Sequence, residues 1–114
     1  MSSIRNKVQL IGRLGTKPEL KEFESGKKRV SFSLATNEYY YTKSGERVEE
    51  TTWHNVVAWE KSAEKMAKIL DKGSEVAIEG KIANRSYEDK DGVKKYITEI
   101  VVEEFVLFGE KVTT

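Results

Sequence analysis

Residues 50–85 read ETTWHNVVAWEKSAEKMAKILDKGSEVAIEGKIANR and carry the clearest information about the fold. Residues 50–59 predict a strand, because small apolar side chains alternate with larger or polar ones. Residues 60–71 predict a helix with an apolar stripe of Ala63, Met66, Ala67 and Leu70. We expect Met66 of this stripe to lie in the core. Residues 75–85 predict the next strand, with Val76, Ile78 and Ile82 facing inward. A single helix therefore connects two strands.

Three further strands are predicted outside this segment. Residues 8–14 alternate with a period of two, Gly12 indicates a bend or bulge, and residues 15–18 end the strand. Residues 30–35 alternate in the same way, and a fifth strand covers about 93–108. Hairpin tips are predicted at Lys43-Ser44-Gly45-Glu46 and Asp89-Lys90-Asp91-Gly92. Five strands with one α-helix between strands 3 and 4 indicate a mainly β protein, a five-stranded OB-fold barrel with extended β-hairpins.

The chain has 114 residues, which is the length of one ordinary domain. It contains no repeat and no linker rich in Pro, Gly or Ser. We expect residues 1–109 to form the OB-fold domain and residues 110–114 to be a short C-terminal remnant without an acidic tail.

The composition argues against an enzyme. Cysteine is absent and His54 is the single histidine, so no thiol nucleophile, multi-histidine metal site or other metal site is expected, and no cofactor. Neighbouring carboxylates such as Glu49 and Glu50 point to opposite faces of a strand and form no catalytic pair. A nuclease or hydrolase on this fold would therefore lack a plausible catalytic cluster. No apolar run suits a membrane span or a signal peptide, so we expect a cytoplasmic protein.

The charge is balanced overall but unevenly distributed. The net charge is +1, whereas residues 1–29 hold eight basic and three acidic side chains. Residues 74–114 hold six basic and nine acidic ones. Such asymmetry allows a basic face on a nearly neutral chain.

Eleven aromatic residues are interleaved with cations. Trp53 and Trp59 lie six residues apart on one predicted strand and so face the same side, opposite His54. Tyr87 and Tyr96 flank the second hairpin together with Arg85, Lys94 and Lys95. Bases of single-stranded nucleic acid stack on such rings, and nearby cations neutralise phosphates. The alternative is an aromatic core with cations extending to the surface.

Several segments resemble bacterial single-stranded DNA-binding proteins. They are NKVQLIGRLG at 6–15 with Pro18-Glu19, SLATNE at 33–38, TWHNVV at 52–57, KGSEVAIEG at 72–80 and YITEIVV at 96–102. The blocks keep the family's order and spacing over about residues 4–107. The resemblance implies an OB barrel, usually a homotetramer built from dimers, that coats single-stranded DNA in replication, recombination and repair. It also implies a location at the bacterial nucleoid.

The resemblance also suggests roles for single residues. Trp53, Trp59, Tyr40 and Tyr87 fall where the family has base-stacking rings, and Tyr96 joins them in the predicted aromatic surface. The predicted basic DNA contacts are Lys7, Arg13, Lys61, Lys72, Arg85, Lys94 and Lys95. The predicted subunit interface comprises His54, Lys7, Gln9 and Ile11.

Two expectations remain open. Full-length relatives end in an acidic tip that recruits replication and repair enzymes, and because the last residues here show no such tip, we do not expect tail-mediated partners. An OB-fold module that binds RNA, or a primosomal accessory protein, is the alternative function, although nothing in the sequence reads a 2′-hydroxyl.

Overall fold

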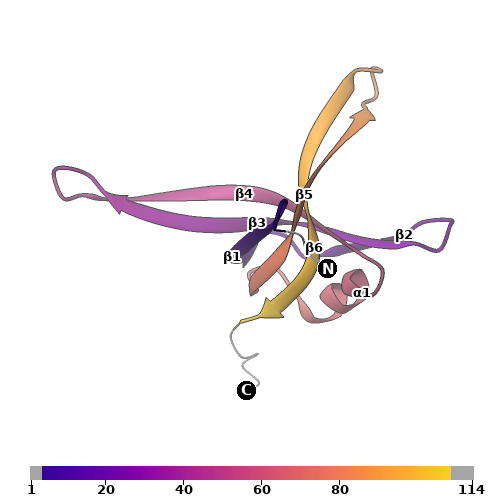
Figure 1. Ribbon diagram of the computed structural model, residues 1–114, viewed down its shortest axis with the longest axis horizontal. Coiled ribbons are helices and arrows are strands. Elements are labelled where there is room, and N and C mark those ends of the chain that lie inside the picture. Colours follow the sequence, from indigo (N-terminus) through magenta and orange to yellow (C-terminus); the bar gives the residue numbers. More distant parts are fainter. Residues whose placement is uncertain (1–3, 109–114) are drawn as a thin grey trace.

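Six strands and one helix follow one another along residues 4–108, the part of the chain that the computed structural model describes (Figure 1). They are β1 (Val8–Leu14), β2 (Glu19–Glu22), β3 (Lys28–Tyr41), β4 (Arg47–Trp59), α1 (Glu60–Ile69), β5 (Glu75–Glu88) and β6 (Lys94–Leu107). Residue 109 and the predicted remnant at 110–114 lie outside the described residues, so that boundary stays a prediction. No helix within residues 4–108 is long and apolar enough to cross a membrane.

Five of these strands close a barrel. Their order is β1, β5, β6, β4 and β3, and β3 pairs back with β1. The closing contact is short, with Arg13 opposite Ala35 and Leu14 opposite Leu34. The β4–β6 pair is parallel and the other pairs are antiparallel. Because α1 lies between the third and fourth barrel strands, the predicted OB fold is confirmed.

Glycine permits the close strand contacts that closure requires. A Cβ on Gly12 of β1 would collide with the carbonyl oxygen of Ala35 on β3. A Cβ on Gly80 of β5 would collide in the same way with the carbonyl oxygen of Val101 on β6. The irregularity in the β5–β6 ladder falls between Glu79 and Gly80. The bend predicted at Gly12 is therefore the place where β1 comes closest to β3.

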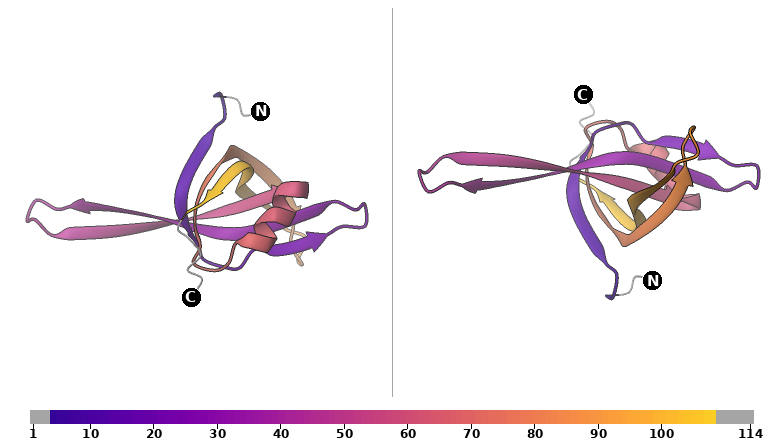
Figure 2. Two further views of the ribbon diagram at one scale, coloured as in Figure 1. Left: turned by 90° about the horizontal axis from the view of Figure 1, so that it is seen from below. Right: turned by 90° about the horizontal axis from the view of Figure 1, so that it is seen from above.

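The core fills the barrel, and α1 covers one end of it (Figure 2). Met66, Ala63 and Leu70 are buried, so the predicted apolar stripe is confirmed. Lys28 on β3 ties the helix to the sheet: its Nζ lies 2.7 Å from Oε1 of Glu64, and its N–H donates to Glu60. The hydrogen bond from Lys28 lowers the pKa of the Glu64 carboxyl. The buried core consists of Leu14, Val30, Phe32, Leu34, Val56, Ala58, Ala63, Met66, Leu70, Val76, Ile78, Ile100 and Val102.

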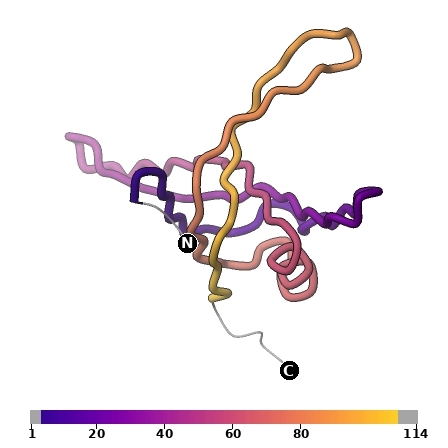
Figure 3. The backbone as a smooth tube through the Cα atoms, turned by 45° about the vertical axis from the view of Figure 1, so that its right-hand side comes forward, coloured from indigo at the N-terminus to yellow at the C-terminus, as the bar shows by residue number. Residues whose placement is uncertain are grey.

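Three hairpins project from the barrel in different directions (Figures 1 and 3). Gly26, Gly45 and Gly92 lie at their tips with φ of +88°, +88° and +78°, a conformation that glycine adopts without strain. The β3–β4 and β5–β6 tips are the two that the sequence predicts. β3, β4 and β5 extend beyond their predicted ends, because an arm with both faces in water has no apolar alternation to reveal it, whereas β6 lies within the predicted 93–108.

Three details of the prediction are wrong. The sequence does not predict β2, because all four of its residues are exposed and show no pattern. Ile82 is 45% exposed rather than inward, because β5 leaves the barrel for its arm just after Gly80. The helix ends at Ile69, two residues early, since Leu70 is already extended.

Candidate functional site

Both tryptophans lie on one outward face of the β3–β4 ladder. Opposed residues of an antiparallel pair face the same side, and Trp53 opposes Ala35 while Trp59 opposes Arg29. Trp53 is 59% exposed and Trp59 is 39% exposed, whereas Val56 and Ala58 between them point into the core. We call this surface the tryptophan face; its members are Arg29, Ser31, Ser33, Ala35, Trp53, Asn55, Val57 and Trp59.

The ring of Trp53 rests on the backbone of Gly15. A Cβ on Gly15 would lie 2.8 Å from Cη2 of Trp53 and 2.9 Å from Oγ of Ser33. The N–H of Gly15 donates to the carbonyl of Ser33 at 2.9 Å, which fixes the glycine against β3. The indole thus has a backbone support on one side and solvent on the other.

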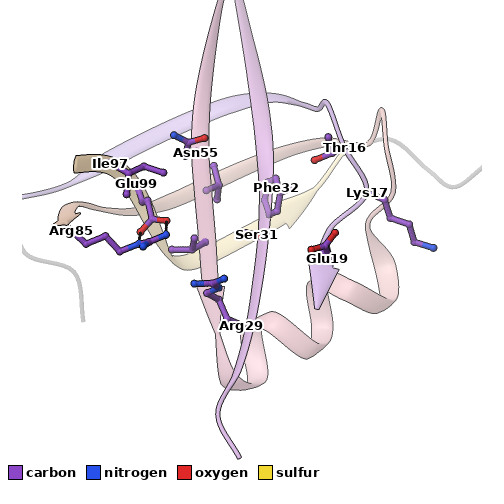
Figure 4. Close-up of a pocket in the computed structure, with 12 residues that line it drawn as sticks. Thr16, Lys17, Glu19, Arg29, Ser31, Phe32, Asn55, Arg85, Ile97 and Glu99 are labelled. Carbon is purple, nitrogen blue, oxygen red and sulfur yellow. Dashed lines mark hydrogen bonds and ion pairs between the residues drawn. The ribbon is translucent and has the colours of Figure 1, made fainter. Parts of the chain in front are cut away.

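Two adjoining hollows form a groove between the tryptophan face and the β5–β6 arm. One hollow, of about 370 Å³, brings Trp53 and His54 of β4 together with Tyr96 of β6. The other, of about 350 Å³, extends past Arg29 to the loop before β2 (Figure 4). Asn55 and Ile97 line both hollows, so the two hollows meet at the base of the arm, with Tyr96 and Arg85 on opposite faces of it.

An ion pair lies at the base of the arm, in the second hollow. Nε and Nη2 of Arg85 donate to the two carboxylate oxygens of Glu99 at 2.9 and 3.1 Å, and Figure 4 shows the two side chains pointing toward each other. Glu99 is only 7% exposed, so this bidentate pair compensates a buried carboxylate. The hydrogen bond with Glu99 raises the pKa of Arg85. The predicted phosphate contact at Arg85 is therefore already occupied by an internal anion.

The β5–β6 arm presents its predicted rings to solvent. Tyr87 and Tyr96 are exposed, with Arg85 5.9 Å from the ring centroid of Tyr87 and Lys94 5.7 Å from that of Tyr96. Lys95 lies 3.8 Å from a carboxylate oxygen of Asp89. The arm thus combines rings with cations, as the sequence predicts.

The β3–β4 arm carries tyrosines on both faces. Tyr40 alternates to the side opposite Trp53, whereas Tyr39 and Tyr41 share the side of Trp53. Arg47 lies 4.1 Å from the ring centroid of Tyr39. The structure therefore brings Tyr39 and Tyr41, rather than the predicted Tyr40, into line with the tryptophan face.

The other predicted basic residues lie outside the groove. Lys7 is 3.3 Å from Glu79, and Arg13 donates to the carbonyl of Gly73 at 3.1 Å. Lys61 lines a hollow between α1 and β6, and Lys72 lies in the turn that joins α1 to β5. These four side chains surround the barrel rather than gathering at one site.

The predicted interface residues separate into two places. Gln9 and Ile11 face outward on β1, and Ile11, 53% exposed, continues an apolar row through Ala77 to Val106. His54 lies elsewhere, half-buried, with Nε2 3.0 Å from Oγ1 of Thr36. Its hydrogen bond is made within the chain.

A cluster at the end of the tryptophan face is not predicted from the sequence. Phe23, from the turn of the β2–β3 hairpin, stacks on Trp59 with ring centroids 6.1 Å apart. Arg29 lies over both rings, and Lys21 lies 5.1 Å from the Phe23 centroid. Only the register of β2, β3 and β4 reveals this cluster, although Phe23 between two lysine-containing segments is a weak signal in the sequence.

This arrangement suits an extended polyanion with flat rings. Exposed aromatic faces take bases by stacking, and adjacent cations neutralise phosphates. Within residues 4–108, no group of three His, Asp or Glu side chains is placed to hold a metal ion.

Comparison with known proteins gives consistent matches. The model of the single-strand binding protein family matches residues 5–108. The single-stranded DNA-binding protein 1 of Chlorobaculum tepidum is 48% identical over 107 residues, which cover 93% of this chain and 66% of that protein. The single-stranded DNA-binding protein of a serogroup A strain of Neisseria meningitidis is 42% identical over 104 residues, covering 91% and 60%. The chain thus spans 60 to 66% of the length of these relatives.

A solved structure shows the same fold. A chain of the Plasmodium falciparum SSB complex with ssDNA superimposes with a TM-score of 0.80 at 31% identity, over 96% of this chain and 98% of that one.

We predict that Gly15→Ala displaces the Trp53 ring, because the added methyl group needs the space that the indole occupies. In a Trp59→Phe background Trp53 is the one remaining indole, so its fluorescence reports the change. The emission maximum should shift to longer wavelength as the ring moves into water. Gly92→Asn, at a hairpin tip where asparagine tolerates positive φ, is the control and should leave the emission unchanged. An unshifted spectrum in Gly15→Ala would show that the ring does not rest on Gly15.

Proposed function

Because the chain belongs to the single-strand binding protein family, we propose that it binds and protects single-stranded DNA, without catalysis, in replication, recombination and repair. The observation that carries the proposal is the groove in which Trp53 and Tyr96, from strands far apart in the sequence, line one hollow. Such a protein would act at the bacterial nucleoid in the cytoplasm.

Stacking supplies the sequence-tolerant part of binding. Every base has a π-face, and each stack on an aromatic ring contributes about 1–3 kcal/mol. Trp53 is held against Gly15, so little conformational freedom is lost when a base stacks on its open side. Tyr96 and Tyr87 on the arm, and Trp59 at the other end of the groove, are the further proposed stacking residues.

Cations supply the salt-dependent part. Lys94 lies beside Tyr96 on one face of the arm and Lys95 lies opposite Tyr87 on the other, so each face offers a cation next to a ring. Exposed ion pairs such as Lys95–Asp89 contribute little, so a phosphate can replace the carboxylate. A strand that continued around the barrel would reach the remaining proposed contacts, which are Lys7, Arg13, Lys61 and Lys72.

The outward face of β1 supports a proposal of self-association. Ile11 and Val106 are exposed apolar side chains at the two ends of one row that also includes Ala77. Gln9 and Lys7 flank this row, which makes it suited to a second copy of the chain. A homotetramer built from dimers is the assembly we propose, with His54 at a second contact.

We predict that oligo-dT quenches tryptophan emission of the protein and that Trp53→Ala weakens binding by about 5- to 150-fold, the equivalent of one lost stack. Phe108→Ala, which removes a partly exposed ring outside the groove, is the matched control and should bind like the parent. Unquenched emission and an unshifted oligonucleotide at low salt would refute the proposed function. If oligo-U competes as well as oligo-dT, the RNA-binding alternative is favoured instead.

We predict that Glu99→Gln strengthens binding to oligo-dT. The slope of log affinity against log salt concentration should also become steeper by about 0.7. The neutral amide no longer holds Arg85 as an ion pair, so the guanidinium gains a phosphate partner. Glu104→Gln, in the hollow beside α1, is the control for loss of a negative charge. A slope equal to that of the parent would mean that Arg85 makes no phosphate contact.

We predict that Ile11→Glu lowers the mass measured by light scattering, because a carboxylate in the apolar row opposes contact with a second copy. Val93→Glu, which changes an equally exposed side chain on the β5–β6 hairpin, should keep the parent's mass. An unchanged mass in Ile11→Glu would place the subunit contact elsewhere.

A further inference from the structure

We infer that the β2–β3 hairpin holds an additional nucleotide subsite, formed by Lys21, Phe23 and Arg29 together with Trp59. The inference rests on the proposed function and extends it beyond the groove. Its ligand is one nucleotide of a single strand, with the base against the Phe23–Trp59 rings and the phosphate at Arg29.

The rings and cations of this hairpin form one preorganised stack. Phe23 and Trp59 are 25° from parallel, with their centroids 6.1 Å apart, which is an offset stack. The Arg29 guanidinium carbon lies 5.4 Å from the Phe23 centroid and 5.9 Å from the Trp59 centroid. Lys21 lies over the Phe23 ring as well. Each contact restrains the others, so the surface is formed before a ligand arrives.

Arg29 is an available cation, unlike Arg85. Arg85 is held by Glu99 and Lys28 by Glu64, whereas no carboxylate within residues 4–108 forms an ion pair with Arg29. Its Nε is buried and finds no hydrogen-bond acceptor among the described residues. A buried donor without an acceptor is costly, and the Arg29 charge has no anion among the described residues. A phosphate in the hollow that Arg29 lines would lie beside the guanidinium and offset this charge. The planar guanidinium fork also matches a phosphate better than an ammonium does.

The hairpin places its charges on different sides. Lys21 opposes Arg29 in the β2–β3 ladder, so both lie on the ligand side. Glu22 opposes Lys28 on the other side, toward α1. Glu19 is on the ligand side, at the wall of the hollow, where Lys17 also lines the wall. The ligand side of the hairpin is therefore basic where the rings lie.

The subsite is continuous with the groove. Arg29 lines the 350 Å³ hollow that also contains Asn55, and Figure 4 shows its side chain at the edge of that hollow. A strand that leaves this hollow past Arg29 would reach Trp59 and then Phe23. One chain can therefore contact a strand from the β5–β6 arm to the opposite hairpin.

The test moves the fluorescent reporter to the hairpin. A chain with Trp53→Phe, Trp59→Phe and Phe23→Trp has one indole, at the proposed subsite, and is titrated with a length series of oligo-dT. We expect its emission to be quenched. The control is a chain with Trp53→Phe, Trp59→Phe and Leu20→Trp, in which Phe23 is kept. Its one indole lies on the side of β2 opposite Lys21, and its emission should not change.

Variants of Arg29 in the parent chain give a second, independent measurement. Arg29→Gln should weaken oligo-dT binding about tenfold and make the salt slope shallower by about 0.7, the effect of one lost phosphate contact. Arg29→Lys should keep the slope while losing part of the affinity, because the charge remains and the stacked plane does not. Lys68→Gln, at the far end of α1, controls for removal of a positive charge, and circular dichroism establishes that each variant is folded.

The outcomes separate the subsite from the function. Quenching at position 23 with a shallower slope in Arg29→Gln supports the subsite. If the reporter is unquenched and Arg29→Gln binds like the parent, while the tryptophan emission of the parent is quenched, the subsite is wrong and the proposed function stands. If the parent itself does not bind oligo-dT, the proposed function fails first.

Discussion

The fold depends on one short contact, where the end of β1 pairs with β3 and closes the barrel. Two residue pairs make this contact, and they are possible because Gly12 lets the Ala35 carbonyl approach closely. Immediately after it, Gly15 bonds to Ser33 and supports the Trp53 ring. Residues 12–15 therefore close the barrel and orient an exposed tryptophan at once. Loss of closure would remove the support of the groove as well as the enclosure of the core.

The sequence predicts the barrel and the helix because their residues separate water from a core. Val56 and Ala58 alternate with Trp53 and Trp59, and Met66 lies on a helical stripe. These patterns indicate which side chains face the core and which face water. β2 and the outer arms have water on both faces and leave no such pattern. The Phe23–Trp59 stack depends on how three strands align, and alignment is a property of the pairing rather than of any one segment.

The cations of this surface are held in two ways. Arg85, Lys7 and Lys28 are held by carboxylates, which orient them and cancel their charge. Arg29 and Arg47 lie on aromatic rings, which orient a guanidinium and leave its charge in place. A chain of net charge +1 can therefore present local positive charge without an overall excess. The net charge gives the sum of the charges and not their distribution over the surface.

β2 ends the sheet, and within residues 4–108 its outer edge has no strand beside it. An open edge is a template for pairing with any neighbouring chain. This edge is only four residues long and carries three charged side chains, so it resists recruitment into a growing sheet. These charges hinder pairing between neighbouring copies of the chain through this edge.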